Sequence, residues 1–161
     1  MLYISNSGSV TVTATNCILR NNTATVFQFD AGNHTLNLSG CTIYGNNVTT
    51  NGGVASFASG TTSGNQTLTA TNTYFYENRG VHGSVFYLES TGAGQYVDLL
   101  NCTFLNNNAT GDGVVHLISS SPTVGQTVIV IQAEIHNNSV NGSGGFISFQ
   151  STTTIPTQFT L

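Results

Sequence analysis

The stretch "NCTFLNNNATGDGVVHL" (residues 101–117) places an Asn-Cys pair, an aromatic residue, a run of Asn, a Gly and apolar residues in a fixed order. The same order occurs at residues 40–57, "GCTIYGNNVTTNGGVASF", and more weakly at residues 132–149, "QAEIHNNSVNGSGGFISF". Residues 15–29 and 71–88 hold two further copies. The apolar anchors of the five copies are 24, 32, 29 and 31 residues apart: Leu19, Ile43, Phe75, Phe104 and Ile135. Repeats of this period are typical of solenoids.

Each copy predicts short strands and no helix. Before the anchor, runs such as "VTVTA" (10–14) and "HTLNL" (34–38) alternate with period two, which indicates a strand with one buried face. After the anchor and a turn comes an apolar strand, as at residues 54–57. We therefore predict an all-β fold, a right-handed parallel β-helix with three short strands per rung and about five rungs. The chain, residues 1–161, is then one β-helix domain or a fragment of a longer one, with copies near 10–29, 34–57, 66–88, 95–117 and 126–149 and a partial rung at 155–161.

The register of the copies forms inward columns of apolar residues. One column contains Val12, Leu36, Leu68, Val97 and Val128. A buried large apolar side chain contributes about 1.5–3 kcal/mol, and one rung holds too few of them to offset the entropy lost when its backbone is ordered. We therefore expect rungs to be stable only when they stack.

Two polar columns accompany the apolar ones. The residues before the Cys position tolerate a left-handed backbone, which predicts a tight turn between the first two strands: Asn16, Gly40, Asn72, Asn101 and Gln132. An Asn also stands three residues after every anchor: Asn22, Asn46, Asn78, Asn107 and Asn138. Because an amide both donates and accepts, stacked copies predict an internal hydrogen-bonded ladder.

The apolar-x-x-Asn block followed by Gly-Gly-apolar resembles the repeat of polymorphic outer-membrane proteins, and of other large surface proteins with right-handed parallel β-helices. "FYEN" (75–78) and "FLNN" (104–107) match the first motif, and "GGV" (52–54) and "GGF" (144–146) match the second. The resemblance implies surface display and adhesion.

Composition excludes several classes of protein. Charged residues are 5% of the chain, against about 25% in an average protein, and Lys plus Arg number 2. A nucleic-acid surface needs several Lys or Arg contacts to phosphate, so we expect no nucleic-acid partner. The absence of a run of about 18 apolar residues predicts no membrane span. Nor does the start of the sequence have the pattern of a signal peptide.

The residues that carry chemistry are scattered in this register. No two carboxylates stack on adjacent rungs, so we predict no enzyme and no catalytic residues. The histidines occupy four different columns and are expected to be polar outward or loop residues, which predicts no metal site and no cofactor: His34, His82, His116 and His136. Cys17 and Cys41 are stacked neighbours, and buried free thiols are the favoured interpretation.

Asn-x-Ser/Thr sequons occur at nine positions: Asn21, Asn33, Asn37, Asn47, Asn65, Asn101, Asn108, Asn137 and Asn141. The Asn-rich and Thr-rich composition produces some of them by chance. Five of the nine (Asn21, Asn47, Asn108, Asn137 and Asn141) are predicted to cluster near one corner, which would make that corner an edge bearing N-linked glycans, with Asn47 and Asn108 the first candidates. Asn101 is the weakest candidate because its turn is tight.

The outward face of the first strand is rich in threonine: Thr11, Thr13, Thr35, Thr67, Thr69 and Thr127. Flat Thr arrays on β-solenoids can bind ice, so an ice- or carbohydrate-binding face is one alternative function, and a degenerate polysaccharide lyase or hydrolase is another. Tyr96, Asp98 and Ile129 interrupt the array, and threonine is also an ordinary strand residue.

The favoured function is a non-enzymatic extracellular or cell-surface module, structural or adhesive and N-glycosylated. Residues 1–4 align with the third strand of a preceding rung, and residues 157–161 align with the first strand of a sixth, with Phe159 and Leu161 matching the inward columns. Open terminal rungs would pair with more strands. The expected partners are therefore flanking rungs of the same chain or copies stacked end to end into a fibre.

Overall fold

A computed structural model describes residues 1–5, 8–58, 64–120, 125–151 and 157–160. The described chain folds as the predicted parallel β-helix of about five rungs, one rung being one turn of the coil. Every strand pairing is parallel, which is the arrangement expected when each turn of a coil lies on the one before.

The first strand of each rung belongs to one six-stranded sheet, the strand-one sheet. Its strands, in spatial order, are β2 (Ser9–Thr15), β5 (Asn33–Ser39), β8 (Gln66–Thr71), β12 (Gln95–Leu100), β16 (Gln126–Ile131) and β20 (Thr157–Thr160). The register places Val12 beside Leu36 and Leu68 beside Val97, as the predicted apolar column requires.

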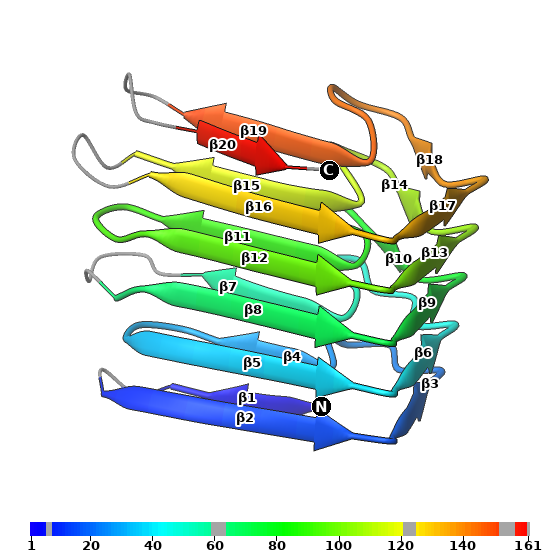
Figure 1. Cartoon of the computed structure of the whole chain (residues 1–161), viewed down its shortest axis with the longest axis horizontal. Helices are drawn as coiled ribbons and strands as arrows, with labels where there is room; N and C mark the ends of the chain where they lie inside the picture. Colours follow the sequence, from blue (N-terminus) through cyan, green and yellow to red (C-terminus); the bar gives the residue numbers. More distant parts are fainter. Residues whose placement is uncertain (6–7, 59–63, 121–124, 152–156, 161) are drawn as a thin grey trace.

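Two further sheets complete the rungs. The strand-two sheet contains β3 (Ile18–Arg20), β6 (Thr42–Tyr44), β9 (Tyr74–Tyr76), β13 (Thr103–Leu105) and β17 (Glu134–His136). The strand-three sheet contains β1 (Leu2–Ile4), β4 (Phe27–Phe29), β7 (Ala55–Ala58), β11 (Phe86–Ser90), β15 (Val115–Ser119) and β19 (Ile147–Ser151). In Figure 1 the strand-one sheet lies in front and points right, the strand-three sheet lies behind and points left, and rungs rise from the N-terminal one, so the coil is right-handed.

A fourth short strand was not predicted. Rungs three to five add the two-residue strands β10 (Arg79–Gly80), β14 (Asn108–Ala109) and β18 (Ser139–Val140), which form a short sheet of their own. Each follows directly after an asparagine of the ladder, and backbone bonds such as Asn108 N–H to Asn78 O, 2.9 Å, continue the parallel register. The ladder therefore holds the chain in register beyond the second strand.

The core runs the length of the coil and is lined by the predicted columns. The aromatic rings stack from rung to rung: Phe29 and Phe57 have ring centroids 4.5 Å apart, and Phe75 and Phe104 have centroids 4.8 Å apart. All four side chains are fully buried. Side chains of adjacent rungs thus fill the core at van der Waals distance along these columns.

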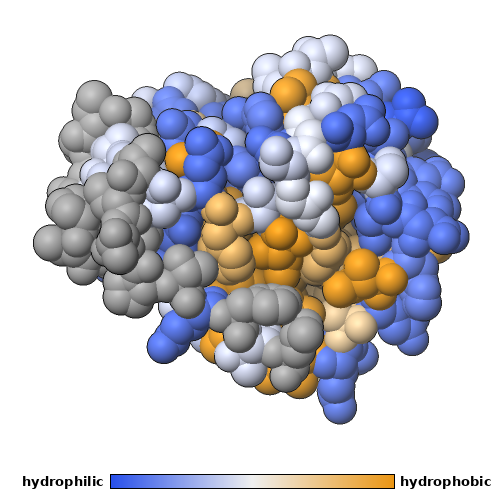
Figure 2. All heavy atoms as spheres, turned by 90° about the horizontal axis from the view of Figure 1, so that it is seen from above, coloured by the Kyte–Doolittle hydropathy of each residue, from blue (hydrophilic) through white to orange (hydrophobic). Residues whose placement is uncertain are grey.

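The outer rungs are less enclosed than the central ones. β1 pairs with β4 and β20 pairs with β16, as predicted for partial rungs, while Leu161 lies outside the described residues. The anchor Ile135 of rung five is 38% exposed, whereas Phe75 and Phe104 are fully buried. Seen from this end, Figure 2 shows apolar side chains at the centre of the molecule. In rung five, Phe146, Ile147 and Phe149 are half-buried.

Candidate functional site

The predicted left-handed column forms the turn between the first two strands. Asn16, Asn72 and Asn101 have φ of 53°, 50° and 50°, and Gly40 has 62°. A second left-handed column, unpredicted, ends the second strand and contains Asn21, Gly45, Glu77, Asn106 and Asn137. Both corners therefore depend on residues that tolerate positive φ, and Glu77 sits in one as a backbone turn residue.

The five asparagines after the anchors form a continuous ladder. Asn46 shows the pattern: its Nδ2 donates to Asn78 Oδ1 at 2.8 Å, and its Oδ1 accepts from Nδ2 and the backbone N–H of Asn22 at 2.7 and 3.0 Å. The amide bonds continue from Asn78 to Asn107 at 3.0 Å and on to Asn138 at 2.9 Å. The second Nδ2 hydrogen of Asn78 goes to Ile43 O at 3.0 Å. Each buried amide uses both of its donors and both of its acceptor positions.

A second ladder, of glutamines, was not predicted. Gln95 Nε2 donates to Gln66 Oε1 at 3.0 Å, and Gln126 Nε2 donates to Gln95 Oε1 at 2.7 Å. All three side chains are buried at the start of the first strand. The signal was present, since each glutamine stands two residues before an inward apolar position and period two therefore points it inward.

His34 occupies the same inward column, which corrects one prediction. It pairs in register with Gln66, is 1% exposed and has its Nε2 2.8 Å from Ala31 O. The expectation of an outward or loop position is wrong for His34 because its place in the strand-one pattern points it inward.

The three cysteines have free thiols, as predicted. Cys41 and Cys102 are buried, and Cys17 is half-buried. Burial raises the pKa of Cys102 to about 11, so this thiol stays protonated and packs as a small apolar side chain.

Seven of the nine sequon asparagines have exposed side chains: Asn21, Asn33, Asn47, Asn65, Asn101, Asn137 and Asn141. Asn37 and Asn108 are half-buried, and Asn37 Oδ1 accepts from Thr69 Oγ1 at 2.7 Å. Asn47 and Asn108 flank Arg79 in register at the short sheet, beside a groove of about 340 Å³ that these residues help to line. These two sequons therefore lie on the same edge of the coil, on either side of rung three.

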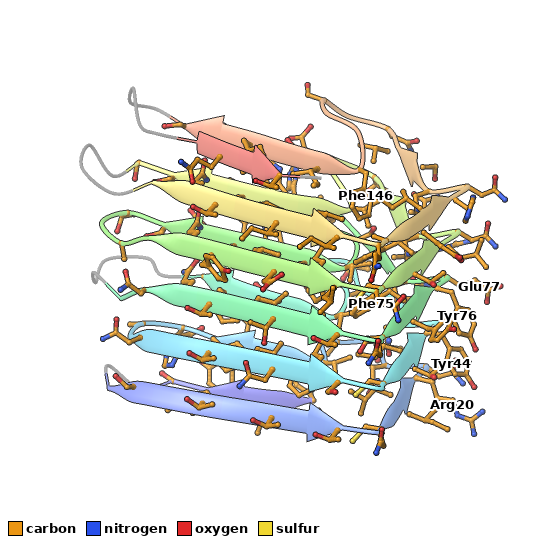
Figure 3. The ribbon with its side chains drawn as sticks, in the orientation of Figure 1. Arg20, Tyr44, Phe75, Tyr76, Glu77 and Phe146 are labelled. Carbon is orange, nitrogen blue, oxygen red and sulfur yellow. The ribbon has the colours of Figure 1, made fainter. Side chains whose placement is uncertain are left out.

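The outer face of the strand-two sheet carries aromatic side chains. The rings of Tyr44 and Tyr76 stack with centroids 4.5 Å apart, and an Arg20 guanidinium nitrogen donates to Tyr44 Oη at 3.0 Å. Figure 3 shows these three side chains projecting outward from successive rungs, with Phe75 and Phe146 on the core side. Tyr74, on the same strand as Tyr76, is 57% exposed. We call Arg20, Tyr44, Tyr74 and Tyr76 the tyrosine face.

The threonine-rich face has the predicted register. Thr11, Thr35, Thr67, Tyr96 and Thr127 form one column, and Thr13, Asn37, Thr69, Asp98 and Ile129 form its neighbour. The side chain of Tyr96 is 37% exposed between threonines. A hollow of about 260 Å³ lies there, lined partly by Thr67, Tyr96 and Thr127. The tyrosine breaks a flat threonine array and gives this face a curved, partly aromatic surface.

The turn before the third strand holds a further column, in which each side chain caps the next rung. Asn51 Oδ1 accepts from His82 N–H at 3.3 Å, His82 Nδ1 accepts from Asp112 N–H at 3.1 Å, and Asp112 Oδ1 accepts from Ser143 N–H. We call Asn51, His82, Asp112 and Ser143 the turn column. Each cap needs one acceptor, and an amide, an imidazole and a carboxylate supply it on successive rungs.

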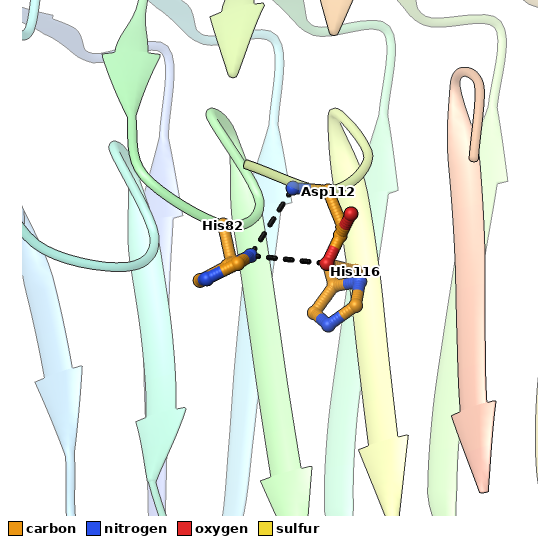
Figure 4. Close-up of side chains that lie close together, drawn as sticks. All are labelled: His82, Asp112 and His116. Carbon is orange, nitrogen blue, oxygen red and sulfur yellow. Dashed lines mark hydrogen bonds and ion pairs between the residues drawn. The ribbon is translucent and has the colours of Figure 1, made fainter. Parts of the chain in front are cut away.

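The turn column brings His82 and Asp112 close to His116, although the histidines do belong to different columns (Figure 4). One nitrogen of each imidazole and one Asp112 carboxylate oxygen lie within 4.8 Å of one another. The separate columns of the histidines therefore do not keep these three side chains apart. The turn before the third strand folds over the outward face of the strand-three sheet. A comparison of columns within one sheet does not reveal a contact between a turn and that sheet.

His116 does lie on the outward face of the strand-three sheet, between the inward Val115 and Leu117, but it is buried there. It is 1% exposed on β15, and its ring packs against that of Tyr87, with centroids 5.8 Å apart, and that of His82, with centroids 5.5 Å apart. Neither of its ring nitrogens has a hydrogen-bond partner in the described part of the chain. Burial lowers the pKa of His116 to about 4, so the imidazole is neutral at pH 7.

Comparison with known proteins yields no family: no family model, curated protein or solved structure matches the chain. Within the residues that the structure describes, no helix has the length and apolar character that a membrane crossing requires.

Proposed function

We propose that this chain is a non-enzymatic structural or adhesive β-helix module that works outside the cell or at its surface. The proposal rests on the positions of the repeated residues. The repeated Asn, Gln and apolar side chains point inward and hold one rung on the next. The outward positions carry mainly Thr, Asn, Ser and Tyr. A surface of this kind suits contact more than catalysis, and it fits the resemblance to surface-protein repeats.

The carboxylates support a non-catalytic role. Glu77 is a left-handed turn residue, and Asp98 lies in register between Thr69 and Ile129. Glycosidic bond cleavage needs two carboxyl groups on either side of the bond, and these positions provide single ones. The degenerate-enzyme alternative therefore gains no support from them.

The glycan proposal rests on the exposed edge. Asn47 and its neighbours along the corner are accessible to a transferase, and a chain with 5% charged residues has little electrostatic repulsion to keep it soluble. Sugars on this edge would supply solubility and leave the tyrosine face on the adjoining sheet open.

The glycan test is intact mass before and after enzymatic deglycosylation of native or secreted eukaryotic material, with peptide mapping. Occupancy is expected at the corner, with Asn47 ahead of the half-buried Asn108. Nine bare sites in native material would overturn the glycan part of the proposal.

The adhesive part rests on the tyrosine face, because exposed Tyr and Arg are enriched in protein interfaces. Beads coated with the chain should adhere to cultured cells through it. The double variant Tyr74→Thr/Tyr76→Leu introduces the residues found at these positions on the next rung, Thr103 and Leu105, and should lower adhesion several-fold. The matched control, Tyr96→Thr, changes an aromatic residue on another sheet. Equal adhesion by all three proteins would contradict this assignment.

The half-exposed apolar side chains at the rung-five end fit further β-helix rungs as partner, either of the same chain or of a second copy. Sedimentation velocity across a concentration series tests whether these 161 residues stack. A monomer at all concentrations would remove end-to-end stacking as a source of those rungs.

Carbohydrate binding on the strand-one face is a second candidate, favoured by Tyr96 beside its hollow. An aromatic ring flanked by hydroxyl and amide groups is a suitable platform for a sugar ring. Titration with an oligosaccharide panel, followed by NMR, should shift resonances of Tyr96 and Thr127, and Tyr96→Thr should abolish those shifts. The ice-binding version predicts thermal hysteresis instead, and the interrupted threonine array argues against it.

A further inference from the structure

We propose that His82, Asp112 and His116 form a binding site for a divalent transition-metal cation such as Zn²⁺, which links rung three to rung four. In proteins Zn²⁺ binds imidazole nitrogen, carboxylate oxygen and thiolate sulfur, and this cluster provides the first two. The three ligand atoms already lie within 4.8 Å of one another. Small side-chain rotations would bring them to bonding distance around one ion, with a fourth position left for water.

The unpartnered imidazole of His116 is the independent sign of a ligand. Buried polar atoms in folded proteins nearly always have a partner, yet Nδ1 and Nε2 of this 1% exposed side chain have none among the described residues. A bound cation would occupy one of the two nitrogens.

The turns around the cluster leave room for its side chains. A Cβ atom at Gly111 would lie 2.5 Å from Nδ1 and Cε1 of His82, and one at Gly142 would lie 2.6 Å from Asp112 Oδ1. The corresponding position one rung before Gly111 holds Val81, so a side chain is tolerated in this turn where no imidazole crosses it. Glycine at 111 thus gives His82 its place beside Asp112.

The two carboxylate oxygens of Asp112 have different partners. Oδ1 accepts from Ser143 N–H and can keep this bond when an ion is bound. Oδ2 faces His82 Nδ1 at 3.4 Å, across the space where the ion would sit. His82 Nδ1 would exchange its hydrogen bond from Asp112 N–H for a metal bond. Since the His82 side chain is 37% exposed, the ion can enter from solvent.

The test uses the tag-free chain, stripped with a chelator and titrated with ZnCl₂ by calorimetry at pH 7. We expect saturable binding of one ion per chain, and a rise in Tm that grows with Zn²⁺ concentration because the ion binds only the folded state. Three variants should each weaken binding at least about tenfold, because each removes one of three ligands: His82→Asn, Asp112→Asn and His116→Ser.

These variants are chosen to preserve the fold. His82→Asn introduces the residue of the preceding rung, Asn51, which caps the next rung in the same way. His116→Ser introduces the residue that pairs with it in register, Ser148. Two controls should bind as the wild type does: His136→Gln removes a histidine elsewhere, and Cys17→Thr removes the most accessible thiol and introduces the residue of Thr73.

NMR of the wild-type imidazoles decides the question even if a variant fails to fold. Zn²⁺ should shift the ring resonances of His82 and His116 and leave those of His34 unchanged. The proposal is overturned if no one-to-one binding occurs, if His34 or His136 shifts instead, or if Cys17→Thr alone abolishes binding.

Discussion

The asparagine ladder and the turn column both connect neighbouring rungs through side chains, but they differ in how many residue types each position accepts. In both, a side chain in one rung accepts from a backbone N–H of a neighbouring rung. The ladder bonds toward the N-terminal rung, as in Asn22 N–H to Asn46 Oδ1, and the turn column bonds toward the C-terminal rung, as in Asp112 N–H to His82 Nδ1. The ladder is asparagine in every rung, whereas the turn column contains four residue types.

Burial accounts for the difference. Asn78 and Asn107 are fully buried, so every donor and acceptor of their amides must find a partner inside the protein. An amide is the one short side chain that offers two donors and a carbonyl acceptor together. His82 and Asp112 are half-exposed, and water can serve the atoms that the cap does not use. The enclosed column therefore serves only the scaffold, and the open column is where chemistry can be placed without loss of the fold.

The largest expected effect is loss of an enclosed amide. Asn78→Leu leaves N–H and Nδ2 of Asn46 without an acceptor and removes the side-chain donor to Ile43 O, which should cost roughly 3–5 kcal/mol of unfolding free energy at about 1–3 kcal/mol per buried group. Urea unfolding followed by circular dichroism measures the loss. Asn22→Leu, at the half-buried end of the ladder, is the control and should cost less than half as much. Equal losses of unfolding free energy in Asn78→Leu and Asn22→Leu would mean that burial does not determine the need for asparagine.

The glutamine ladder should give the next largest effect. Gln95→Leu leaves Gln66 Oε1 without its donor and Gln126 Nε2 without its acceptor, at a cost of roughly 2–3 kcal/mol. Replacing all three glutamines by Leu should cost much less than three times this value, because the ladder bonds are then removed with both of their partners. Val10 already stands at the start of the column in rung one, in register with His34. If the loss of unfolding free energy in the triple variant equalled the sum of the three single losses, the glutamines would not share one hydrogen-bond chain.

The same contrast explains what the sequence could predict. Period-two alternation determined the strands, and an asparagine after every anchor determined the ladder, because enclosed columns repeat. Gln66 and His34 were within reach of that reasoning, since their spacing from Leu68 and Leu36 points them inward, but a polar residue in an inward column gives no apolar signal. The His116 cluster was not within reach. Its members come from a strand and two turns, and they meet only because glycine-containing turns lie over the strand-three sheet.

The smallest expected effect concerns the open column and tests its freedom directly. In the presence of a chelator, His82→Asn should change the unfolding free energy by no more than about 0.5 kcal/mol, because Asn supplies an acceptor for Asp112 N–H as Asn51 does for His82. His82→Leu removes the acceptor and should cost about 1 kcal/mol, the net value of one hydrogen bond in a half-exposed turn. The two variants, compared by urea unfolding, separate the cap from the imidazole ring. If His82→Asn lost as much as Asn78→Leu, the imidazole itself would be part of the scaffold, and the turn column would have no more sequence freedom than the ladder. A small loss for Asn and a larger one for Leu would leave the imidazole available for a role that the fold does not require.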